Sequence, residues 1–514
     1  MFARTSTGAI VGVEAVRVAV EANCGGSGLG LELVGLPDNA VKESRQRIRA
    51  AFENSGLHMT QRLTVVNLAP ADLRKEGASF DLPIAVCMLA VTNQIPDTML
   101  GETMFAGELS LDGTLKSVRG ILPMALCARR EGLRRMVVPS GNAAEAAVVD
   151  GLEVIAVESI GQTVAFLRGD AAIGPARPAQ TYGATDAAGR FDEDFADVKG
   201  QARVKRALEI AACGGHNVIM IGSPGSGKTM LARRLPTILP PLSRDEALET
   251  TKIHSVAGKS DVRQGLMSRR PFRAPHHLAS QVALIGGGQS PQPGEVSLAH
   301  NGILFLDELP EFGRSVLEVL RQPLEDKRIT VSRSKYSVEY PCNFTLVAAM
   351  NPCPCGYYNH PDKECTCGAA AVQRYVNRIS GPLLDRIDIH VEVTPVPLSD
   401  LSAPSSGEEP SAVIRERVMR AREIQRRRFD GIAGVHTNAM MNSKMLREFC
   451  PLEPRAGALL ESAMERLRLS ARAYDRIIKV ARTIADMDGS QNITQAHIAE
   501  AIQYRTLDRE GWGG

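Results

Sequence analysis

The chain has 514 residues, of which 44% are hydrophobic, and its 60 basic and 58 acidic side chains give a net charge of +2. This length predicts two or three domains. The near balance of charge excludes recognition of a polyanion by overall electrostatics, so a nucleic-acid partner must meet a local basic patch.

The sequence also predicts a protein with no membrane partner. No apolar run approaches the roughly 18 residues of a membrane-spanning helix, and residues 1–12 lack the charged and then apolar pattern of a secretory signal. The ten cysteines are sparse for this length and six are scattered singly, which is typical of reduced thiols. We therefore expect a cytoplasmic protein.

Residues 1–168 predict a compact α/β domain. Short β-rich runs such as 15–22 and 63–68 alternate there with helical patterns at 39–55 and 81–92. Residues 169–190 are rich in Ala, Gly, Pro and Thr without a periodic apolar face. We expect this second segment to be a flexible linker between independently folded units.

Two stretches of the first domain resemble the proteolytic domain of Lon-type proteases. They are Lys-Glu-Gly-Ala-Ser-Phe-Asp-Leu-Pro at 75–83 and Gly-Glu-Leu-Ser-Leu-Asp-Gly at 107–113. Ser79 falls at the position of the nucleophile, whereas Leu122 occupies the position of the lysine base and Lys116 lies nearby. A serine without a base stays protonated and unreactive. The resemblance implies a Lon-like fold without peptidase activity, serving as a ring-forming or DNA-facing platform.

A phosphate loop is predicted in the next unit, residues 191–396. Its sequence at 217–229 is Asn-Val-Ile-Met-Ile-Gly-Ser-Pro-Gly-Ser-Gly-Lys-Thr, an apolar strand followed by a Gly-rich loop and Lys-Thr. Such a loop turns backbone N–H groups toward the phosphates of ATP, while the lysine reaches the β/γ-phosphates and the threonine hydroxyl binds Mg²⁺. The predicted nucleotide-binding residues are Gly222, Ser223, Pro224, Gly225, Ser226, Gly227, Lys228 and Thr229.

Two later strands supply the rest of the predicted ATP site. Ile-Leu-Phe-Leu at 303–306 is typical of a buried parallel strand, and Asp307 and Glu308 follow at its carboxyl end. We expect Asp307 to bind Mg²⁺ with Thr229, and Glu308 to polarise the attacking water. Asn351 ends the next apolar strand and is expected to orient that water.

A basic β-hairpin is predicted at 325–340, where apolar and polar residues alternate around Ser-Arg-Ser-Lys. Its basic residues are Lys327, Arg328, Arg333 and Lys335. Phosphates are the ligands that a basic tip binds well, so the hairpin predicts DNA binding. A solvated surface hairpin is the alternative.

Four cysteines form a candidate zinc site. Cys353 and Cys355 are separated by nine residues from Cys365 and Cys367. Four thiolates are the ligand set of a closed, tetrahedral structural Zn²⁺ site. His360, between the pairs, can replace one ligand, and disulfides or free thiols are the alternatives to zinc.

The stretches around these motifs resemble the magnesium-chelatase-like AAA+ ATPases. They include Arg-Arg-Pro-Phe-Arg-Ala-Pro-His-His at 269–277, Gly-Gly-Gly at 286–288 and Pro-Gly-Glu-Val-Ser-Leu-Ala-His-Asn-Gly at 293–302. Within that family the chain is most similar to the competence protein M branch, the competence-associated DNA helicases. The resemblance covers essentially the whole chain. It implies an AAA+ α/β core, a linker at 397–410 and a C-terminal helical lid domain at 411–514.

The resemblance also implies an assembly and further site residues. Proteins of this branch form hexameric rings, in which an arginine finger acts on the ATP of a neighbouring subunit. Arg386 matches the finger segment and Arg378 is its rival, while Arg472 resembles the second sensor near the γ-phosphate. For the adjacent His276 and His277 we expect hydrogen bonds that couple to the nucleotide rather than a metal.

The sequence therefore predicts an ATP- and Mg²⁺-dependent, homo-hexameric DNA motor, a helicase or branch-migration enzyme in recombination during DNA uptake. Its partners would be single-stranded or branched DNA and further copies of itself. A protein-remodelling or magnesium-chelatase-type AAA+ ATPase is the alternative, and an ATP-dependent protease is disfavoured by the missing lysine.

The purified protein should not cleave casein-type substrates, with or without ATP, because Ser79 has no lysine base at the position that the Lon-type proteases use. Release of soluble peptides measures this. Cleavage that disappears in Ser79→Ala would contradict it.

Overall fold

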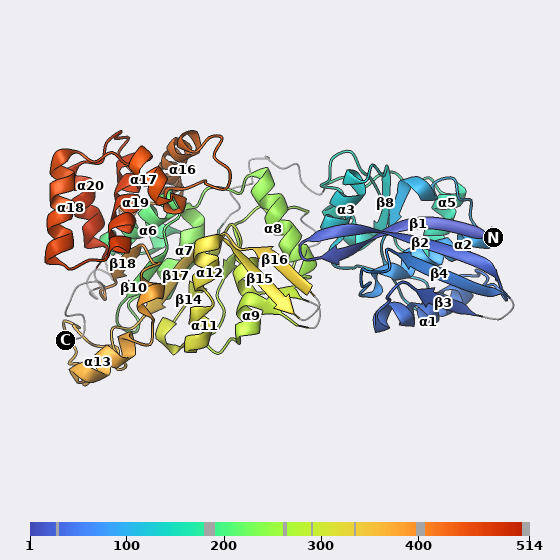
Figure 1. Ribbon diagram of the computed structural model, residues 1–514, viewed down its shortest axis with the longest axis horizontal. Coiled ribbons are helices and arrows are strands. Elements are labelled where there is room, and N and C mark those ends of the chain that lie inside the picture. The colour runs from blue at the N-terminus through green and yellow to red at the C-terminus, as the bar shows by residue number, and fades with distance from the viewer. Residues whose placement is uncertain are drawn as a thin grey trace.

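The computed structural model describes residues 1–26, 30–178, 191–260, 265–288, 291–333, 336–396 and 407–505. An N-terminal α/β unit forms one end, a second α/β unit the middle and a group of helices the other end (Figure 1). The predicted fold class, an α/β core between a second α/β unit and C-terminal helices, is confirmed. Within those ranges no helix combines the length and the hydropathy that a membrane crossing requires.

The N-terminal unit is built on a seven-stranded mixed sheet with the order β3-β4-β2-β1-β5-β8-β9. Its strands are β1 (Phe2–Val11), β2 (Glu14–Gly26), β3 (Leu31–Val34), β4 (Leu63–Ala69), β5 (Thr103–Phe105), β8 (Arg135–Pro139) and β9 (Glu153–Val157). A small separate ladder pairs β6 (Glu108–Leu109) with β7 (Leu115–Lys116). The helices are α1 (Asn39–Asn54), α2 (Asp81–Val91), α3 (Ile121–Arg130), α4 (Ala143–Ala146) and α5 (Ile160–Arg168).

The predicted runs at 15–22, 63–68, 39–55 and 81–92 correspond to β2, β4, α1 and α2. Strand β1 was not predicted. Its buried residues include Thr5, Ser6 and Thr7, so the strand lacks the apolar signal by which a buried strand is recognised.

The middle unit contains a five-stranded parallel sheet with the order β11-β14-β17-β10-β18. Its strands are β10 (Val218–Ile221), β11 (Phe272–Arg273), β14 (Ile303–Leu306), β17 (Thr345–Met350) and β18 (Ile389–Glu392). Alternate residues of β10 face two different clusters, since Val218 and Met220 belong to one and Ile219 and Ile221 to the other. Both faces of the sheet are therefore covered, as a parallel sheet requires.

Helices and two short ladders surround this sheet. The helices are α6 (Ala202–Gly214), α7 (Lys228–Ile238), α8 (Arg244–Val256), α9 (Gln281–Ile285), α10 (Glu295–Leu298), α11 (Arg314–Glu318), α12 (Arg321–Asp326), α13 (Ala369–Val376) and α14 (Gly381–Leu384). The ladders pair β12 (Gly286–Gly287) with β13 (Gln292–Pro293) and β15 (Arg328–Arg333) with β16 (Tyr336–Pro341). The second ladder is the predicted hairpin.

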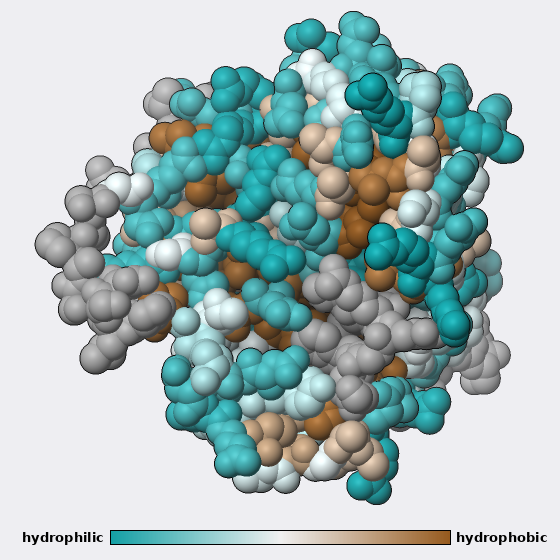
Figure 2. All heavy atoms as spheres, turned by 90° about the vertical axis from the view of Figure 1, so that its left-hand side faces the viewer, coloured by the Kyte–Doolittle hydropathy of each residue, from teal (hydrophilic) through white to brown (hydrophobic). Residues whose placement is uncertain are grey.

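The C-terminal segment is helical, as predicted. It comprises α16 (Ser411–Arg428), α17 (Ser443–Phe449), α18 (Pro454–Arg466), α19 (Ala471–Met487) and α20 (Gln495–Gln503), and Thr494 is the N-cap of α20. Its apolar residues share one core cluster with α6, α7 and one face of the middle sheet. The end of the molecule that carries these helices is covered mainly by hydrophilic residues, with apolar residues in separate patches (Figure 2).

The N-terminal unit docks on α8 of the middle unit (Figure 1). The Gly120 amide donates to the Ser255 carbonyl at 3.2 Å, and the Ser255 hydroxyl donates to the buried carboxylate of Glu145. Lys252 forms an ion pair with Glu14 at 2.6 Å. The expected linker at 169–190 is described only as far as residue 178. The two units thus share a polar interface in addition to their covalent connection.

Burial raises the pKa of Glu145 above its ordinary value, although hydrogen bonds from Ser255, Leu122 and Asn142 offset part of the shift. A raised pKa in the folded state means that stability present below the ordinary pKa of glutamate is lost as the pH rises through the folded value. Glu145→Gln keeps an acceptor for Leu122 and cannot ionise. Its urea midpoint should therefore fall less than that of the wild type as the pH rises above the ordinary glutamate pKa toward 8.

The exposed Glu131→Gln is the matched control, and its urea midpoint should follow that of the wild type across the same pH series. Parallel pH curves for the wild type and Glu145→Gln would contradict the prediction.

Candidate nucleotide site and cysteine cluster

The phosphate loop joins β10 to α7 and has the backbone that its glycines predict. Gly225 and Gly227 have φ values of +78° and +93°, a region that residues with a Cβ rarely adopt. At Gly222 a Cβ would collide with the Val393 carbonyl oxygen of the neighbouring β18 edge. The loop is thus shaped by backbone freedom at two positions and by close packing at the third.

Lys228 lies at the first position of α7 and is buried. Its Nζ donates to the carbonyl oxygens of Gly222 and Ser223, at 2.6 and 2.9 Å, and to Asn351 Oδ1 at 3.2 Å. Burial lowers the pKa of Lys228, and the nearby Asp307 offsets part of that shift. The amine is therefore held between the phosphate loop and the end of β17.

Thr229 and Asp307 form the second contact of the site. Thr229 Oγ1 donates to Asp307 Oδ2 at 2.7 Å, and the Glu308 amide donates to Asp307 Oδ1 at 2.9 Å. A hydroxyl and a carboxylate so close together are a suitable ligand pair for Mg²⁺, which prefers oxygen ligands. The structure thus brings together five predicted residues, Lys228, Thr229, Asp307, Glu308 and Asn351.

Glu308 stands in the left-handed region, with φ +52°, and its side chain is more than half exposed. His277 Nδ1 lies 3.2 Å from Glu308 Oε2, and the His277 ring meets the edge of Phe312. His276 stacks beside His277 at a ring distance of 4.2 Å. His277 thus contacts the expected base of the nucleotide site, in line with the predicted coupling of this pair of histidines to the nucleotide.

The described residues fit Mg²⁺ and ATP. The hydroxyls of Ser223 and Ser226 are buried in the loop and have no hydrogen-bond partner within the described part of the chain. Ser226 lies two residues before Lys228, where loop groups converge on phosphate oxygens. Lys228 and the loop would hold the phosphates, and Thr229 and Asp307 the ion.

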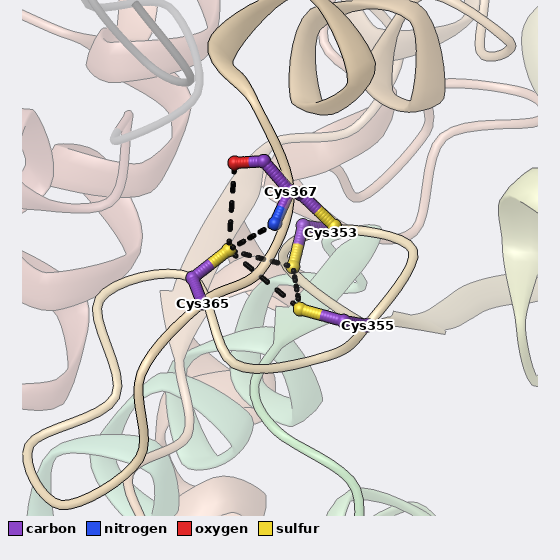
Figure 3. Close-up of side chains that lie close together, drawn as sticks. All are labelled: Cys353, Cys355, Cys365 and Cys367. Carbon is purple, nitrogen blue, oxygen red and sulfur yellow. Dashed lines mark hydrogen bonds between the residues drawn. The ribbon is translucent and has the colours of Figure 1, made fainter.

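The four cysteines of the predicted zinc site lie together (Figure 3). The Sγ of Cys353 is 3.3 Å from that of Cys355 and 3.7 Å from that of Cys365, and the Sγ atoms of Cys355 and Cys365 are 3.6 Å apart. Tetrahedral Zn²⁺ with Zn–S bonds of about 2.3 Å requires S···S separations of about 3.8 Å. All four thiols are free, so the disulfide alternative is not observed.

His360 does not join the cluster. Its Nδ1 accepts the amides of Asp362 and Lys363 at 3.0 and 3.1 Å, and its ring meets Tyr357. The four thiols, whose sulfur atoms all lie within 4.8 Å of one another, already give the ligand count of a tetrahedral site without it. The cysteine residues therefore fit a closed site for one thiophilic ion.

Arg386 and Arg472 lie at the opposite edge of the sheet from the phosphate loop. The Arg386 carbonyl accepts from Asn217, which precedes β10, and Arg472 pairs with Asp385 at 3.3 Å. Gly222 lies five residues beyond Asn217 on the other side of β10, at about 3.3 Å per residue, so roughly 15 Å or more separate this edge from Gly222. The expectation that Arg472 lies near the γ-phosphate is not met within one chain.

The two finger candidates differ in place and exposure. Arg386 is only 7% exposed and pairs with Glu325 at 2.5 Å. Arg378 is about half exposed and pairs with Glu311 at 2.9 Å, close to the end of β14. Arg378 thus lies at the edge of its own nucleotide site, whereas Arg386 lies at the far edge and needs release from Glu325 to reach a ligand.

The four predicted basic residues of the hairpin differ in position and in exposure. Lys327 has φ +55° and ends α12, so it lies at the base of the hairpin and not at its tip. Burial lowers its pKa. Arg328 is exposed and pairs with Glu339 at 3.2 Å. The Arg333 side chain and Lys335 lie outside the described residues.

Ser79 is not supplied with a base in the described part of the chain. Leu122 is fully buried, and no hydrogen bond joins Ser79 to a lysine or histidine there. Lys75 lies four residues before Ser79 and burial lowers its pKa, but its amine donates to the Pro70 carbonyl. The absence of peptidase activity stays a prediction.

Three family models match the chain in order. They are "Subunit ChlI of Mg-chelatase" at residues 20–142, "Magnesium chelatase, subunit ChlI" at 194–401 and "Magnesium chelatase, subunit ChlI C-terminal" at 408–505. Competence protein ComM of Haemophilus influenzae is 43% identical over 501 residues, which cover 98% of this chain and 97% of ComM. The chain belongs to the ComM branch of the magnesium-chelatase-like family.

Other relatives show how far each likeness extends. Uncharacterized protein YifB of Escherichia coli is 44% identical over 504 residues, covering 98% of this chain and 97% of YifB. The magnesium-chelatase 67 kDa subunit of Heliobacterium mobile is 29% identical over 194 residues, only 32% of this chain and 29% of that subunit. The likeness to ComM and YifB thus includes the N-terminal unit and the helical segment, whereas the likeness to the chelatase subunit covers about a third of the chain.

Two features of the site were not predicted from the sequence. One is Glu325, which pairs with Arg386 from helix α12, directly before the hairpin. The other is Gly356, whose φ of +85° places the cysteine turn against Pro224 of the phosphate loop. The glycine directly after Cys-x-Cys is a signal for a tight turn, but no local pattern identifies what the turn contacts.

Glu308→Gln should bind ATP as the wild type does and lower its turnover by a factor on the order of 10² to 10⁴, the usual contribution of a general base. His277→Ala should cause a smaller loss, because His277 only contacts Glu308. Phosphate release and binding of a fluorescent ATP analogue measure the two effects.

The control is His58→Ala, an exposed histidine of the N-terminal unit, which should leave turnover unchanged. Wild-type turnover by Glu308→Gln would contradict its assignment as the base.

Proposed function

We propose that the protein is an ATP-driven DNA motor that assembles as a ring, most simply a hexamer, and acts in recombination during DNA uptake. The observation that carries the ring is the division of charged residues between the two edges of one sheet. Lys228, Asp307 and Glu308 lie at the carboxyl edge, and Arg386 and Arg472 at the other.

A second copy of the chain can bring Arg386 and Arg472 to a nucleotide that they do not reach within their own chain. Phosphoryl transfer requires positive charge on the transferring group in addition to Mg²⁺. Arg386 and Arg472 cannot supply it to the nucleotide of their own chain across the roughly 15 Å that separate their edge from Gly222. If the far edge of one copy faces the carboxyl edge of the next, these arginines approach the neighbour's phosphates. Such a heterologous contact closes into a ring when its rotation allows.

The DNA partner is supported by the hairpin and by the relatives. Strand β15 begins at Arg328 and ends at Arg333, and Lys335 belongs to the segment between β15 and β16. Basic side chains on a hairpin bind phosphates without regard to sequence, which suits a motor that moves along DNA. The full-length likeness to a competence protein connects this activity to DNA uptake.

A magnesium-chelatase-type or protein-remodelling ATPase is the second candidate. The family models carry the description of the chelatase subunit, and they match all three parts of the chain. DNA distinguishes the two functions, because only the DNA motor should respond to it.

We also propose that the four cysteines hold one structural Zn²⁺. The ion would be bound by the thiolates of Cys353, Cys355, Cys365 and Cys367, and binding would release the protons of those thiols. With four protein ligands no position remains for a substrate, so the role is to fix the loop rather than to perform chemistry.

Single-stranded or forked DNA should stimulate ATP hydrolysis, and the protein with ATP should displace a labelled strand from a forked or three-stranded junction. Glu308→Gln should bind the junction without displacing the strand, because it lacks the expected base. An ATPase rate that neither DNA changes would contradict the DNA motor and favour the second candidate.

The hairpin is tested by the triple change Arg328→Ala, Arg333→Ala and Lys335→Ala. DNA stimulation should fall, and the dependence of log affinity on log salt should become shallower by about one for each lost phosphate contact. The control is Arg49→Ala, since Arg49 is exposed and pairs with Glu53 at 3.0 Å, much as Arg328 pairs with Glu339.

A further inference from the structure

The cysteine cluster is in direct contact with the phosphate loop. Gly356 follows Cys355 and packs against the ring of Pro224, so closely that a Cβ on Gly356 would lie 2.5 Å from Pro224 Cδ. The proline ring is rigid and cannot move aside as the end of a long side chain can. The position of Gly356 therefore determines where the phosphate loop can lie.

The turn that carries Gly356 also carries two of the four thiols. The Gly356 amide donates to the Cys353 carbonyl at 3.0 Å, which closes the turn Cys353–Gly356. Cys353 and Cys355 meet the sulfur of Cys365 across the loop. An ion held by all four sulfurs fixes this turn relative to the second cysteine pair.

Both ends of the cysteine segment are attached to the nucleotide site. Asn351, whose Oδ1 accepts from Lys228, lies two residues before Cys353. On the other side, α13 begins directly after Gly368. Burial raises the pKa of Tyr375 of α13, and the neighbouring Asn351 backbone offsets part of that rise, so this helix also lies beside Asn351. A change in the cysteine segment is thus transmitted to Asn351 from two directions and to Pro224 from a third.

We propose that metal occupancy of the cysteine cluster controls the affinity of the phosphate loop for nucleotide. The ion holds the turn Cys353–Gly356 against Pro224 and so keeps the loop in its phosphate-binding shape. This inference depends on the proposed Zn²⁺ and on binding of ATP, and it is independent of DNA and of ring assembly.

The physical basis is the cost of ordering a loop. Residues of an unrestrained loop lose conformational entropy when they are fixed in one conformation. With the metal bound, this cost is met by metal–sulfur bonds before ATP arrives. Without the metal, part of the free energy of ATP binding is used to order the loop, so the apparent affinity for ATP must decrease.

Two variants of the full-length protein test the proposal, with a fluorescent ATP analogue as the probe and mass spectrometry for metal content. Cys365→Ser removes one metal ligand and changes no residue of the turn Cys353–Gly356 that packs on Pro224. We expect it to lose zinc and to bind the analogue at least tenfold more weakly, which corresponds to about 1.4 kcal/mol. Gly356→Ala keeps the four thiols and displaces the turn from Pro224. It should retain zinc and show a similar loss of nucleotide affinity.

Matched controls lie at positions of the same residue types. A Cβ on Gly368, next to Cys367, would meet nothing within 4 Å, so Gly368→Ala should keep both zinc and nucleotide affinity. Cys24→Ser changes a buried thiol outside the cluster, beside Thr60 Oγ1, and should also match the wild type. Thermal unfolding of each variant shows that the fold is kept.

Each outcome has a distinct meaning. Zinc-free Cys365→Ser with wild-type affinity, or Gly356→Ala with wild-type affinity, would overturn the coupling alone. Wild-type protein that contains no zinc would overturn the metal site and the coupling with it. Wild-type protein that does not bind the analogue would overturn the proposed ATPase and with it the motor.

Discussion

The register of three parallel strands is the constraint on which the nucleotide site depends. Ile221 of β10 pairs with Met350 of β17, and Leu306 of β14 pairs with Ala348 of the same strand. The ends of the strands therefore lie at one edge, where the Gly222 amide donates to the Met350 carbonyl at 3.2 Å and Lys228 reaches Asn351. A shift of one residue in either pairing would reverse the direction of the following side chain and separate these groups.

The same register gives the sheet two functionally different edges. The carboxyl edge collects the phosphate loop and the acids, whereas the other edge collects Asn217, Asp388 and the arginines that contact them. Arg476 donates to Asp388 at 2.9 Å, so the helical segment is attached at this second edge, away from its own phosphate loop. A subunit with this arrangement is best completed by a neighbour, which is why the division of charge supports an assembly.

The N-terminal unit packs directly against the hairpin of the middle unit. Val13, in the turn between β1 and β2, packs with the core cluster that contains Ile329 and Val331 of the hairpin, and a Cβ on Gly12 would lie 2.7 Å from Val338. Together with the contacts on α8, this packing braces the base of the hairpin from the outside. The N-terminal unit thus has a structural role in the chain that needs no catalytic serine.

Much of the site was predictable from the sequence. Local patterns identified the phosphate loop, Asp307, Glu308 and Asn351, because a glycine loop or a polar residue after an apolar strand has the same meaning in any parallel sheet. Four cysteines in two close pairs likewise predicted their own cluster. These signals are short and depend little on the rest of the chain.

Other features could not be predicted in this way. Strand β1 lacked an apolar signal because buried threonines and a serine fill it. Lys327 was assigned to the DNA-binding hairpin although it ends helix α12, and Arg472 was expected near a γ-phosphate although it lies at the far edge from the phosphate loop of its own chain.

The sequence by itself thus determined that the chain has a phosphate-binding loop with its acidic partners, and that four thiols gather in one cluster. Only the tertiary structure decided which edge of the sheet each arginine occupies, that Glu325 covers Arg386, and that the cysteine turn rests on Pro224. The physical reason is that these contacts join residues far apart in the chain. Their partners are selected by strand order and packing, which no local spacing of residues encodes.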